Sequence, residues 1–409
     1  MEQVHGTHNE SKFKSKDIIS TMPENVITNI LNRLPLGDAL ATALLARNWR
    51  LKWTLLTELV FDKEFFDLVD EFKEEYDWTI ISSLLLHIKG PVTKFVLYVP
   101  CDNKSDLKDI IHWVLFLSKR GMNEFTLINM HRDKLKLPSH LLSCLELKHL
   151  KLCNCCLNQA PSFCGFPNLL SLDLYRVTIE GENCGKFITQ CPLLEMLEIS
   201  YHDPTRKVKL VEIAKLGNLI KLSLPLCKLD DIAITSSSIF QLGTYLPKLQ
   251  ELFLDFRNHK FIGEVSARKW GCTFFPCLKS LTLHPIDFNS DTMLSCLFEM
   301  IQGSPNLQIL NIKAAYDGVI PPPAFSFPKV DNNTMGPLQL QHVVFSSFRG
   351  SENEVYLIKY LLGSSPLLKK MVIQPHSDAV FGGANGTFMF ARKLLKLHRA
   401  STIAEVDLY

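Results

Sequence analysis

The sequence has no uninterrupted apolar run long enough to span a bilayer, and residues 1–16 lack the apolar segment of a signal peptide. It also lacks an excess of either charge, because 44 Lys and Arg stand against 42 Asp and Glu, a formal net charge of +2. This balance offers no electrostatic footprint for nucleic acid or an anionic membrane. Twelve cysteines in 409 residues are too dilute for a disulfide scaffold. We therefore expect a soluble protein of the nucleus and/or cytoplasm with reduced cysteines.

Catalytic and cofactor motifs are missing as well. The sequence His131-Arg132-Asp133 resembles a kinase catalytic loop, but Pro138 stands where that loop has an asparagine. The cysteines between Cys153 and Cys164 lack the paired Cys-x-x-Cys knuckles of a zinc site. The glycine-rich stretch 382–386 lacks the Lys-Ser/Thr of a phosphate loop. We expect no catalytic residue, no metal and no cofactor, so the chain is predicted not to be an enzyme.

The dominant pattern in the sequence is Leu-x-x-Leu-x-Leu or an apolar variant of it. Eleven copies begin at Val92, Met122, Leu147, Leu169, Leu194, Leu219, Leu249, Leu278, Leu307, Leu340 and Leu368, and they are spaced by 22 to 33 residues. A leucine-rich repeat has a period of about 20–29 residues. The copies starting at Leu147 and Leu219 extend to the full signature with Cys155 and Cys227, which are expected to point inward. A helical protein that is merely rich in leucine is the alternative, and eleven in-phase copies argue against it.

This period predicts a solenoid in which each short strand turns its leucines inward and a helix or loop covers the other side. Prolines placed two residues before the first leucine, such as Pro167, fit entry into a strand. Helical patterns separate the strands, for example Asp291 to Gln302 and Ser351 to Leu362. The second starts with a Ser-x-x-Glu capping box formed by Ser351 and Glu354. The proline-rich stretch 314–336 is predicted to be an irregular insertion between repeats.

The segment from Asp17 to Asp62 does not follow the repeat. Thr21-x-x-Glu24 predicts a capping box, followed by apolar residues at helical spacing up to Pro35. Asp38 is expected to cap a second short helix. Trp49 and Trp53, four residues apart, are expected to share one face of a third. Three such helices cannot bury all of their apolar surface, so part of it is expected to meet a partner or the repeats.

These N-terminal residues resemble a plant F-box. The matching stretches are DIISTMPENVITNILNRLP at 17–35, Asp38-Ala39, LARNWR at 45–50, Trp53 and LVFD at 59–62. Met22 stands where leucine is usual, and Ala46-Arg47-Asn48 replaces a common Ser-Lys-Arg. The C-terminal part is similar to the FBD module in LQHVVFSSFRG at 340–350, Glu352, Glu354, YLL at 360–362, KKMVI at 369–373, RAS at 399–401 and Glu405-Val406. Nearly the whole chain thus resembles the plant F-box/FBD/leucine-rich-repeat family.

The resemblance implies an α/β protein with a three-helix F-box followed by a horseshoe of leucine-rich repeats. The expected divisions are a disordered tail at 1–16, the F-box at 17–62, the solenoid at 63–336 and FBD-like repeats closing it at 337–409. Its implied function is that of a substrate-recognition adaptor in an SCF-type (Skp-cullin-F-box) ubiquitin ligase. A leucine-rich-repeat scaffold or inhibitor without a ligase role is the alternative. A small molecule or inositol phosphate in the horseshoe, as some plant relatives have, also stays open.

Two sets of binding residues follow from this interpretation. By similarity, the F-box residues expected to contact the Skp-family linker, and through it a cullin, are Pro23, Ile30, Leu34, Leu45 and Trp49; packing of the three helices is their other possible role. Side-chain alternation places a target-binding set on the concave side of the strands, namely Asp173, Tyr175, Glu198, Glu251, Phe253 and Asp255. Their carboxylates are expected in water, where they would meet a basic target protein beside apolar anchors. An ordinary solvated sheet surface is the alternative for any one of them.

Overall fold

The computed structural model describes residues 21–69, 78–101, 109–158, 163–180, 184–200, 209–225, 233–234, 236–257, 260–261, 273–315, 337–376, 391–392, 394 and 396–408. They form two compact units, which divide the chain between Val96 and Leu97. The expected tail at 1–16, most of the proline-rich insertion, Cys227 and the glycine-rich stretch at 382–386 lie outside the described residues. None of the helices in the described part of the chain has the length and hydropathy needed to cross a membrane.

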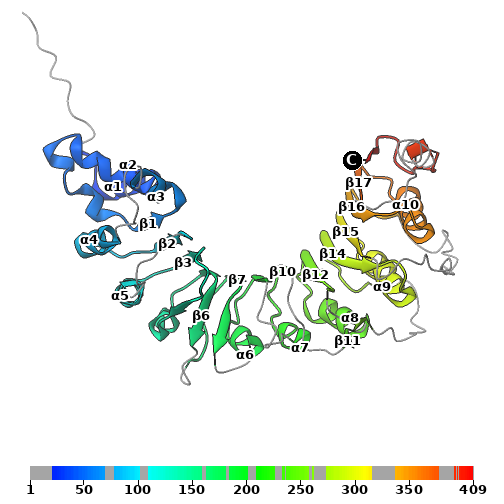
Figure 1. Cartoon of the computed structure of the whole chain (residues 1–409), viewed down its shortest axis with the longest axis horizontal. Coiled ribbons are helices and arrows are strands. Elements are labelled where there is room, and N and C mark those ends of the chain that lie inside the picture. Colours follow the sequence, from blue (N-terminus) through cyan, green and yellow to red (C-terminus); the bar gives the residue numbers. More distant parts are fainter. Residues whose placement is uncertain are drawn as a thin grey trace, which may run out of the picture. The chain divides into compact units, whose positions relative to one another are not determined.

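The first unit is mainly helical (Figure 1). Its elements are α1 (Glu24–Leu31), α2 (Leu36–Ala41), the 3-10 turns η2 (Thr42–Leu44), η3 (Arg47–Trp49) and η4 (Lys52–Leu55), strand β1 (Glu58–Phe61), α3 (Lys63–Val69), α4 (Thr79–His87) and the start of β2 (Lys94–Val99). On α1 the fully buried residues are Ile27 and Leu31, four apart on one face. Asn32 joins this helix to β1, because its amide donates to the Thr57 hydroxyl at 2.8 Å and its carbonyl accepts from the Thr57 N–H at 3.2 Å.

Three expectations about local structure in this unit are wrong. Pro23, with no side-chain cap hydrogen bond, occupies the N-cap of α1, so Thr21 and Glu24 form no capping box there. Asp38 lies inside the first turn of α2, whose N-cap is Pro35. The third helix is replaced by the short turns η3 and η4, which are 3-10 in geometry. In each case the proline or the tight turn moves the helix boundary away from the residue that the pattern favours.

The second unit is organised around a parallel sheet. Its strands, in the order in which they pair, are β3 (Glu124–Asn129), β5 (His149–Cys153), β7 (Ser171–Tyr175), β9 (Met196–Ser200), β10 (Lys221–Leu224), β12 (Glu251–Asp255), β14 (Ser280–Asp287), β15 (Ile309–Ala315), β16 (His342–Phe348), β17 (Lys370–Pro375) and β18 (Glu405–Leu408). Each copy of the repeat from Met122 onward carries one of these strands, and β2 carries the copy at Val92. Strand β18 has no such copy and was not expected.

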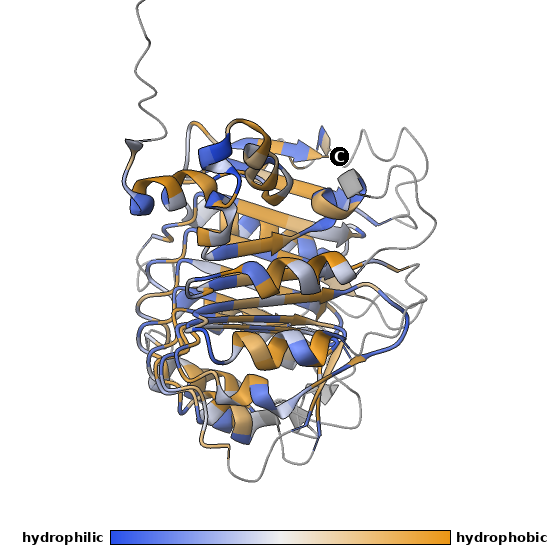
Figure 2. Ribbon diagram, turned by 90° about the vertical axis from the view of Figure 1, so that its left-hand side faces the viewer, coloured by the Kyte–Doolittle hydropathy of each residue, from blue (hydrophilic) through white to orange (hydrophobic). Residues whose placement is uncertain are grey.

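The middle apolar residue of each repeat lies opposite its counterpart on the next strand. This row runs through Phe125, Leu150, Leu172, Leu197, Leu222, Leu252, Leu281, Leu310, Val343, Met371 and Val406. All but the last are buried. Figure 2 shows hydrophobic positions along the strands and on the helices packed against them. The stacked apolar rows are therefore the core of the unit, and each strand completes the burial of its neighbour.

Helices cover one side of this sheet (Figure 1). They are α5 (Asp109–Leu117), α6 (Cys184–Thr189), α7 (Leu210–Ile213), α8 (Ser236–Tyr245), α9 (Asp291–Gln302) and α10 (Glu352–Ser364), with the 3-10 turn η5 (Ser139–Ser143). Helix α9 has the expected bounds. The capping box expected on α10 is confirmed, with Ser351 accepting from the Glu354 N–H and Glu354 accepting from the Ser351 N–H at 2.7 Å.

Asparagines tie consecutive repeats together in a way that the leucine pattern does not reveal. Asn168, Asn218 and Asn306 each precede the first leucine of a repeat. Their amides donate to the carbonyls of Leu145, Pro192 and Pro276 at 3.1, 3.1 and 2.7 Å, each two residues before the first leucine of the preceding repeat. These carbonyls lie in the turns that lead into the strands, so the prolines of the pattern belong to turns rather than to strand entries.

A second sheet was also not expected. It consists of the short parallel strands β4 (Leu135–Leu137), β6 (Cys155–Asn158) and β8 (Thr178–Glu180). Two further short strands, β11 (Ala233–Ile234) and β13 (Lys260–Phe261), pair in parallel. Asn154, with a φ of +55°, turns the chain between β5 and β6. Its amide donates to the carbonyl of His131 at 2.7 Å, and Cys155 follows it fully buried, as the repeat signature predicts.

The stacked core predicts a large effect for a single truncation. Leu281 is fully buried between Leu252 and Leu310 on the neighbouring strands. Leu281→Ala should lower the free energy of unfolding by about 2–5 kcal/mol, through lost burial and the cavity left behind. Urea denaturation measures this, with Ser280→Ala as the neighbouring control. Equal shifts of the two midpoints would mean that the register of this strand is wrong.

Candidate binding surfaces

The first unit exposes several large apolar side chains. Leu44 is 90% and Leu45 is 74% accessible, and Val26, Ile30, Leu34 and Leu51 are also exposed. On α1 the exposed Val26 and Ile30 lie about 100° around the helix from the buried Ile27 and Leu31. A leucine in water forfeits the favourable free energy of burial, so adjacent exposed leucines make this surface a candidate contact for a partner.

The five expected linker-binding residues differ in the exposure of their side chains. Pro23, Ile30, Leu34 and Leu45 have accessible side chains. Trp49 is only 6% exposed and therefore packs within the unit, so the expectation that it presents a free apolar surface is wrong. Leu44, the most exposed large apolar residue in the described part of the chain, was not among the expected linker-binding residues. Nothing in a short helical stretch distinguishes the inward from the outward leucine when the helix changes to 3-10 geometry after Ala41.

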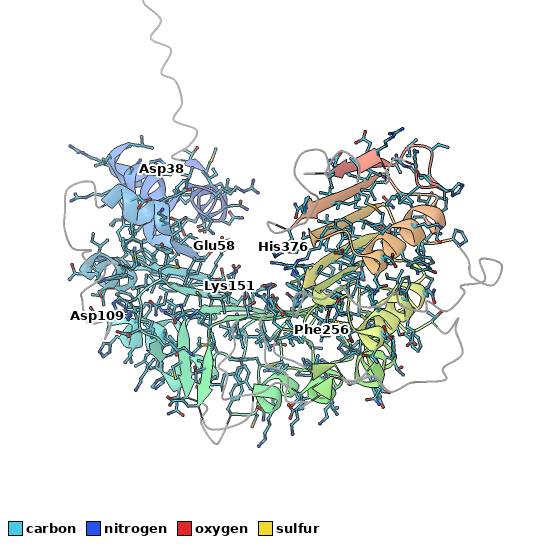
Figure 3. The ribbon with its side chains drawn as sticks, turned by 45° about the vertical axis from the view of Figure 1, so that its right-hand side comes forward. Asp38, Glu58, Asp109, Lys151, Phe256 and His376 are labelled. Atoms are coloured by element: carbon cyan, nitrogen blue, oxygen red, sulfur yellow. The ribbon has the colours of Figure 1, made fainter. Side chains whose placement is uncertain are left out.

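The second unit presents the side of its sheet that lies away from the helices; we call this side the strand face. Lys151 of β5 is labelled on it in Figure 3. In its middle row, register aligns Lys151, Asp173, Glu198, Ser223, Phe253, Thr282, Asn311, Val344, Val372 and Asp407. In the row before it, register aligns His149, Ser171, Met196, Lys221, Glu251, Ser280, Ile309, His342, Lys370 and Glu405. The expected target-binding residues Asp173, Glu198, Glu251 and Phe253 belong to these rows.

The carboxylates of the strand face are largely paired with cations of the same chain. Asp173 meets the ammonium of Lys151 at 2.7 Å, and Glu251 meets that of Lys221 at 3.7 Å. The hydrogen bond that the Lys151 ammonium donates to Asp173 raises the pKa of Lys151 above its ordinary value. Glu198 has no ion pair with a described residue, but its charge helps to raise the pKa of Lys151. The face is therefore close to charge-compensated rather than acidic, unlike the surface expected from the carboxylates alone.

Asp255 does not face solvent, which corrects the expectation for this residue. Its side chain is 1% exposed and accepts hydrogen bonds from Nε and Nη2 of Arg257, the latter at 2.7 Å, and from the Arg257 N–H at 2.9 Å. A buried carboxylate needs such partners to offset its lost hydration. Alternation placed Asp255 in water, but the arginine two residues later folds back over it. Asp255 therefore shapes the end of β12 and is not accessible to a target.

Aromatic residues on the strand face are partly accessible. Tyr175 at the end of β7 is exposed, and Phe253 is half-buried. The ring of Phe253 meets the imidazole of His284 edge-on, with centroids 5.0 Å apart. Burial lowers the pKa of His284, so this imidazole is neutral near pH 7. Phe253 is thus held in one orientation by its neighbour.

The cysteine-rich segment has structural uses. Cys155 donates from its thiol to the carbonyl of Cys153 at 3.1 Å, and Cys156 donates to Glu180 at 3.2 Å. Burial raises the pKa of Cys155 and, together with Glu180, raises that of Cys156 to about 11. Within the described ranges no three His, Cys, Asp or Glu side chains come together in a group that could hold a metal ion.

Comparisons with known proteins match three parts of the chain. The F-box domain model covers residues 19–59, and the FBD model covers 338–373. Between them, residues 110–242 match the model described as FBD-associated F-box protein At5g56370, LRR repeats. The matches therefore define a protein with an F-box and leucine-rich repeats, and the adjacent exposed leucines Leu44 and Leu45 fall within the F-box match.

Relatives carry these parts in their names, and one of them matches this chain along most of its length. The chain is 29% identical over 385 residues to the F-box/FBD/LRR-repeat protein At1g13570 of Arabidopsis thaliana, covering 88% of this chain and 91% of that protein. It is 28% identical to the Arabidopsis thaliana FBD-associated F-box protein At4g10400 over 62% of this chain and 65% of that one. The F-box/FBD/LRR-repeat protein At5g56420 of the same plant is 28% identical over 48% of this chain and 46% of its own length. The chain therefore matches F-box, leucine-rich-repeat and FBD models in this order, and it is similar to plant proteins named for these parts.

The burial of the cysteines predicts a pattern of thiol reactivity. Cys101, Cys164 and Cys277 are exposed, whereas burial raises the pKa of Cys144 to about 12 and that of Cys191 to about 11. Because the thiolate is the nucleophile, iodoacetamide at pH 8 should alkylate the first three and spare the last two in the folded protein. Peptide mass spectrometry measures the labelling, and labelling in urea is the control.

The buried thiols of Cys144 and Cys191 make the free energy of unfolding depend on pH in the alkaline range. Their folded-state pKa values exceed the unfolded value of about 8.5, so the unfolded chain releases protons that the folded chain keeps. Stability should therefore fall as the pH rises above about 8.5, and the loss from these thiols should end near the folded pKa values of about 11 and 12. Replacing Cys144 and Cys191 with Ala should flatten this part of the profile, and an unchanged slope would contradict the assignment.

Proposed function

We propose that the chain is the substrate-recognition adaptor of an SCF-type ubiquitin ligase. The observation that carries this proposal is the pair of adjacent, highly exposed leucines, Leu44 and Leu45, within the F-box match. F-box domains generally bind Skp-family linkers, and an apolar surface that no described element of its own unit covers suits such a contact. The linker would join the chain to a cullin scaffold in the nucleus and/or cytoplasm.

The proposed linker surface is made of Pro23, Ile30, Leu34, Leu44 and Leu45. Trp49 supports it from within, since it is buried. A few fully desolvated side chains carry most of the binding energy in a protein interface, and the contacts around them exclude water. The adaptor itself performs no chemistry, because it raises the local concentration of a target beside the enzyme that modifies it.

The repeats would form a horseshoe whose strand face holds the target protein. Of the residues expected for this role, Asp173, Tyr175, Glu198, Glu251 and Phe253 stay candidates. Asp255 takes a supporting role behind Arg257. Because the charges of the face are paired with each other, the apolar side chains must supply most of the affinity, and exposed ion pairs contribute about 0–1 kcal/mol each.

Charge introduced at the exposed leucines should abolish linker binding. The double variant Leu44→Asp, Leu45→Asp should weaken the binding of a purified Skp-family linker to the full chain by at least about tenfold, since a carboxylate buried without a partner is costly. Both side chains are exposed, so the thermal midpoint should stay unchanged. The matched control is Leu86→Asp on α4, where the leucine is 80% exposed outside the F-box match.

Two outcomes would overturn the assignment. Linker binding that is equal in the parent and the double variant would mean that this surface is not the contact. Failure of the parent chain to co-purify with any Skp-family linker would instead favour a scaffold or inhibitor that acts through its repeats alone.

A further inference from the structure

The strand face changes character along the sheet. Over the five strands from β12 to β17, no residue of the middle row carries a formal charge: Phe253, Thr282, Asn311, Val344 and Val372 lie in register. Ile309 in the adjoining row is exposed beside them. We call these six residues the neutral strip. At a strand spacing of about 4.8 Å, it extends roughly 19 Å across the sheet.

Several polar groups in and beside the neutral strip are paired with each other. The amide of Asn311 donates to the Thr282 hydroxyl at 3.1 Å, and the Ser346 hydroxyl donates to the Gln374 carbonyl at 2.7 Å. His284 lies edge-on to Phe253. A partner that removes water from this surface therefore leaves few unsatisfied groups, and the desolvation cost is small.

Lys313 is the cation beside the strip that lacks an acidic partner. It lies at the end of β15, opposite Ser346 in register, and is exposed. Its ammonium makes no hydrogen bond or ion pair to a described residue, whereas Arg257 is paired with Asp255 and Lys370 with Asp407. A carboxylate on a partner would form an ion pair with the Lys313 ammonium. Because this pair would stay in contact with water, forming it would cost little desolvation free energy.

The first half of the strand face differs in this respect. There Lys151 and Asp173 occupy the middle row, joined by an ion pair. Covering such a pair with apolar surface costs desolvation that its own attraction only partly offsets. An apolar segment of a partner would therefore bind with a more favourable free energy on the neutral strip than on the strands that precede it.

We propose that the neutral strip holds an apolar segment of the target protein that also carries a carboxylate, which meets Lys313. This inference rests on the proposed function only in taking the strand face as the target site. The proposed target segment is acidic and apolar, whereas a count of carboxylates on the face suggests a basic one.

Selection of peptides from a random phage-displayed library on the immobilised full-length chain tests the proposal. Enriched peptides should combine apolar residues with Asp or Glu. Ile309→Asp should weaken their binding by at least about tenfold, since the added carboxylate would be buried against apolar side chains. Its matched control is Met196→Asp, because Met196 lies in the same row on β9 and is 40% exposed, against 39% for Ile309. Val344→Asp provides a second variant within the strip.

Charge exchange then tests the role of Lys313. Lys313→Glu should weaken the acidic peptides about two- to fivefold, as expected for an exposed ion pair, and replacing the peptide carboxylate with lysine should restore the loss. Enrichment of basic peptides, or stronger loss from Met196→Asp than from Ile309→Asp, would overturn the proposal while leaving the strand face as the target site. Failure to enrich any peptide would also count against it. None of these outcomes depends on linker binding, which the leucine variants in the F-box measure separately.

Discussion

The second unit depends on one repeated contact, in which the middle apolar residue of each strand packs against its counterpart on the next. No strand can bury this residue by itself, so every repeat is stabilised by its neighbours. The repeats differ in length from 22 to 33 residues, yet the pairs from Phe125 to Met371 stay in register. The variable length is taken up between the strands, where helices, turns and the second sheet form. The contact therefore fixes the sheet and leaves the remainder of each repeat free to differ.

The strands could be predicted because their signal is local. Three apolar positions within six residues determine both the strand and its inward face. The bonds that join repeats could not be read in this way. The amide of Asn306 reaches the carbonyl of Pro276, 30 residues earlier, so the donor and acceptor carry no short-range pattern. Strand β18 was missed for a related reason: it has Val406 and Leu408 but no copy of the repeat, and pairing with β17 determines its structure.

The Ser/Thr-x-x-Glu pattern predicts a capping box at one helix of this chain and fails to do so at another. Ser351 and Glu354 form the expected capping box because Ser351 is the N-cap, with an extended backbone. Thr21 and Glu24 have the same spacing, but Pro23 takes the N-cap, which makes Glu24 the first helical residue rather than the third. Trp49 illustrates a similar limit. An apolar residue near a helix end can face a partner or the interior with equal sequence support, and only the packing of the turns around it places Trp49 inside.

The strand face shows why formal charge is a poor guide to what a surface binds. Asp173, Glu251 and Asp255 each have a cation within reach, two of them on neighbouring strands. Those partners are about a repeat apart in the chain, so a count of carboxylates along one strand cannot include them. The paired ions produce only a weak net electrostatic field at the surface, and covering them with a partner costs desolvation free energy. The residues that distinguish one part of the face from another are then the uncharged ones, which lose little when water is removed. For this reason the specificity of the face should follow the shape and apolar character of its later strands, with Lys313 setting the orientation of what lies on them.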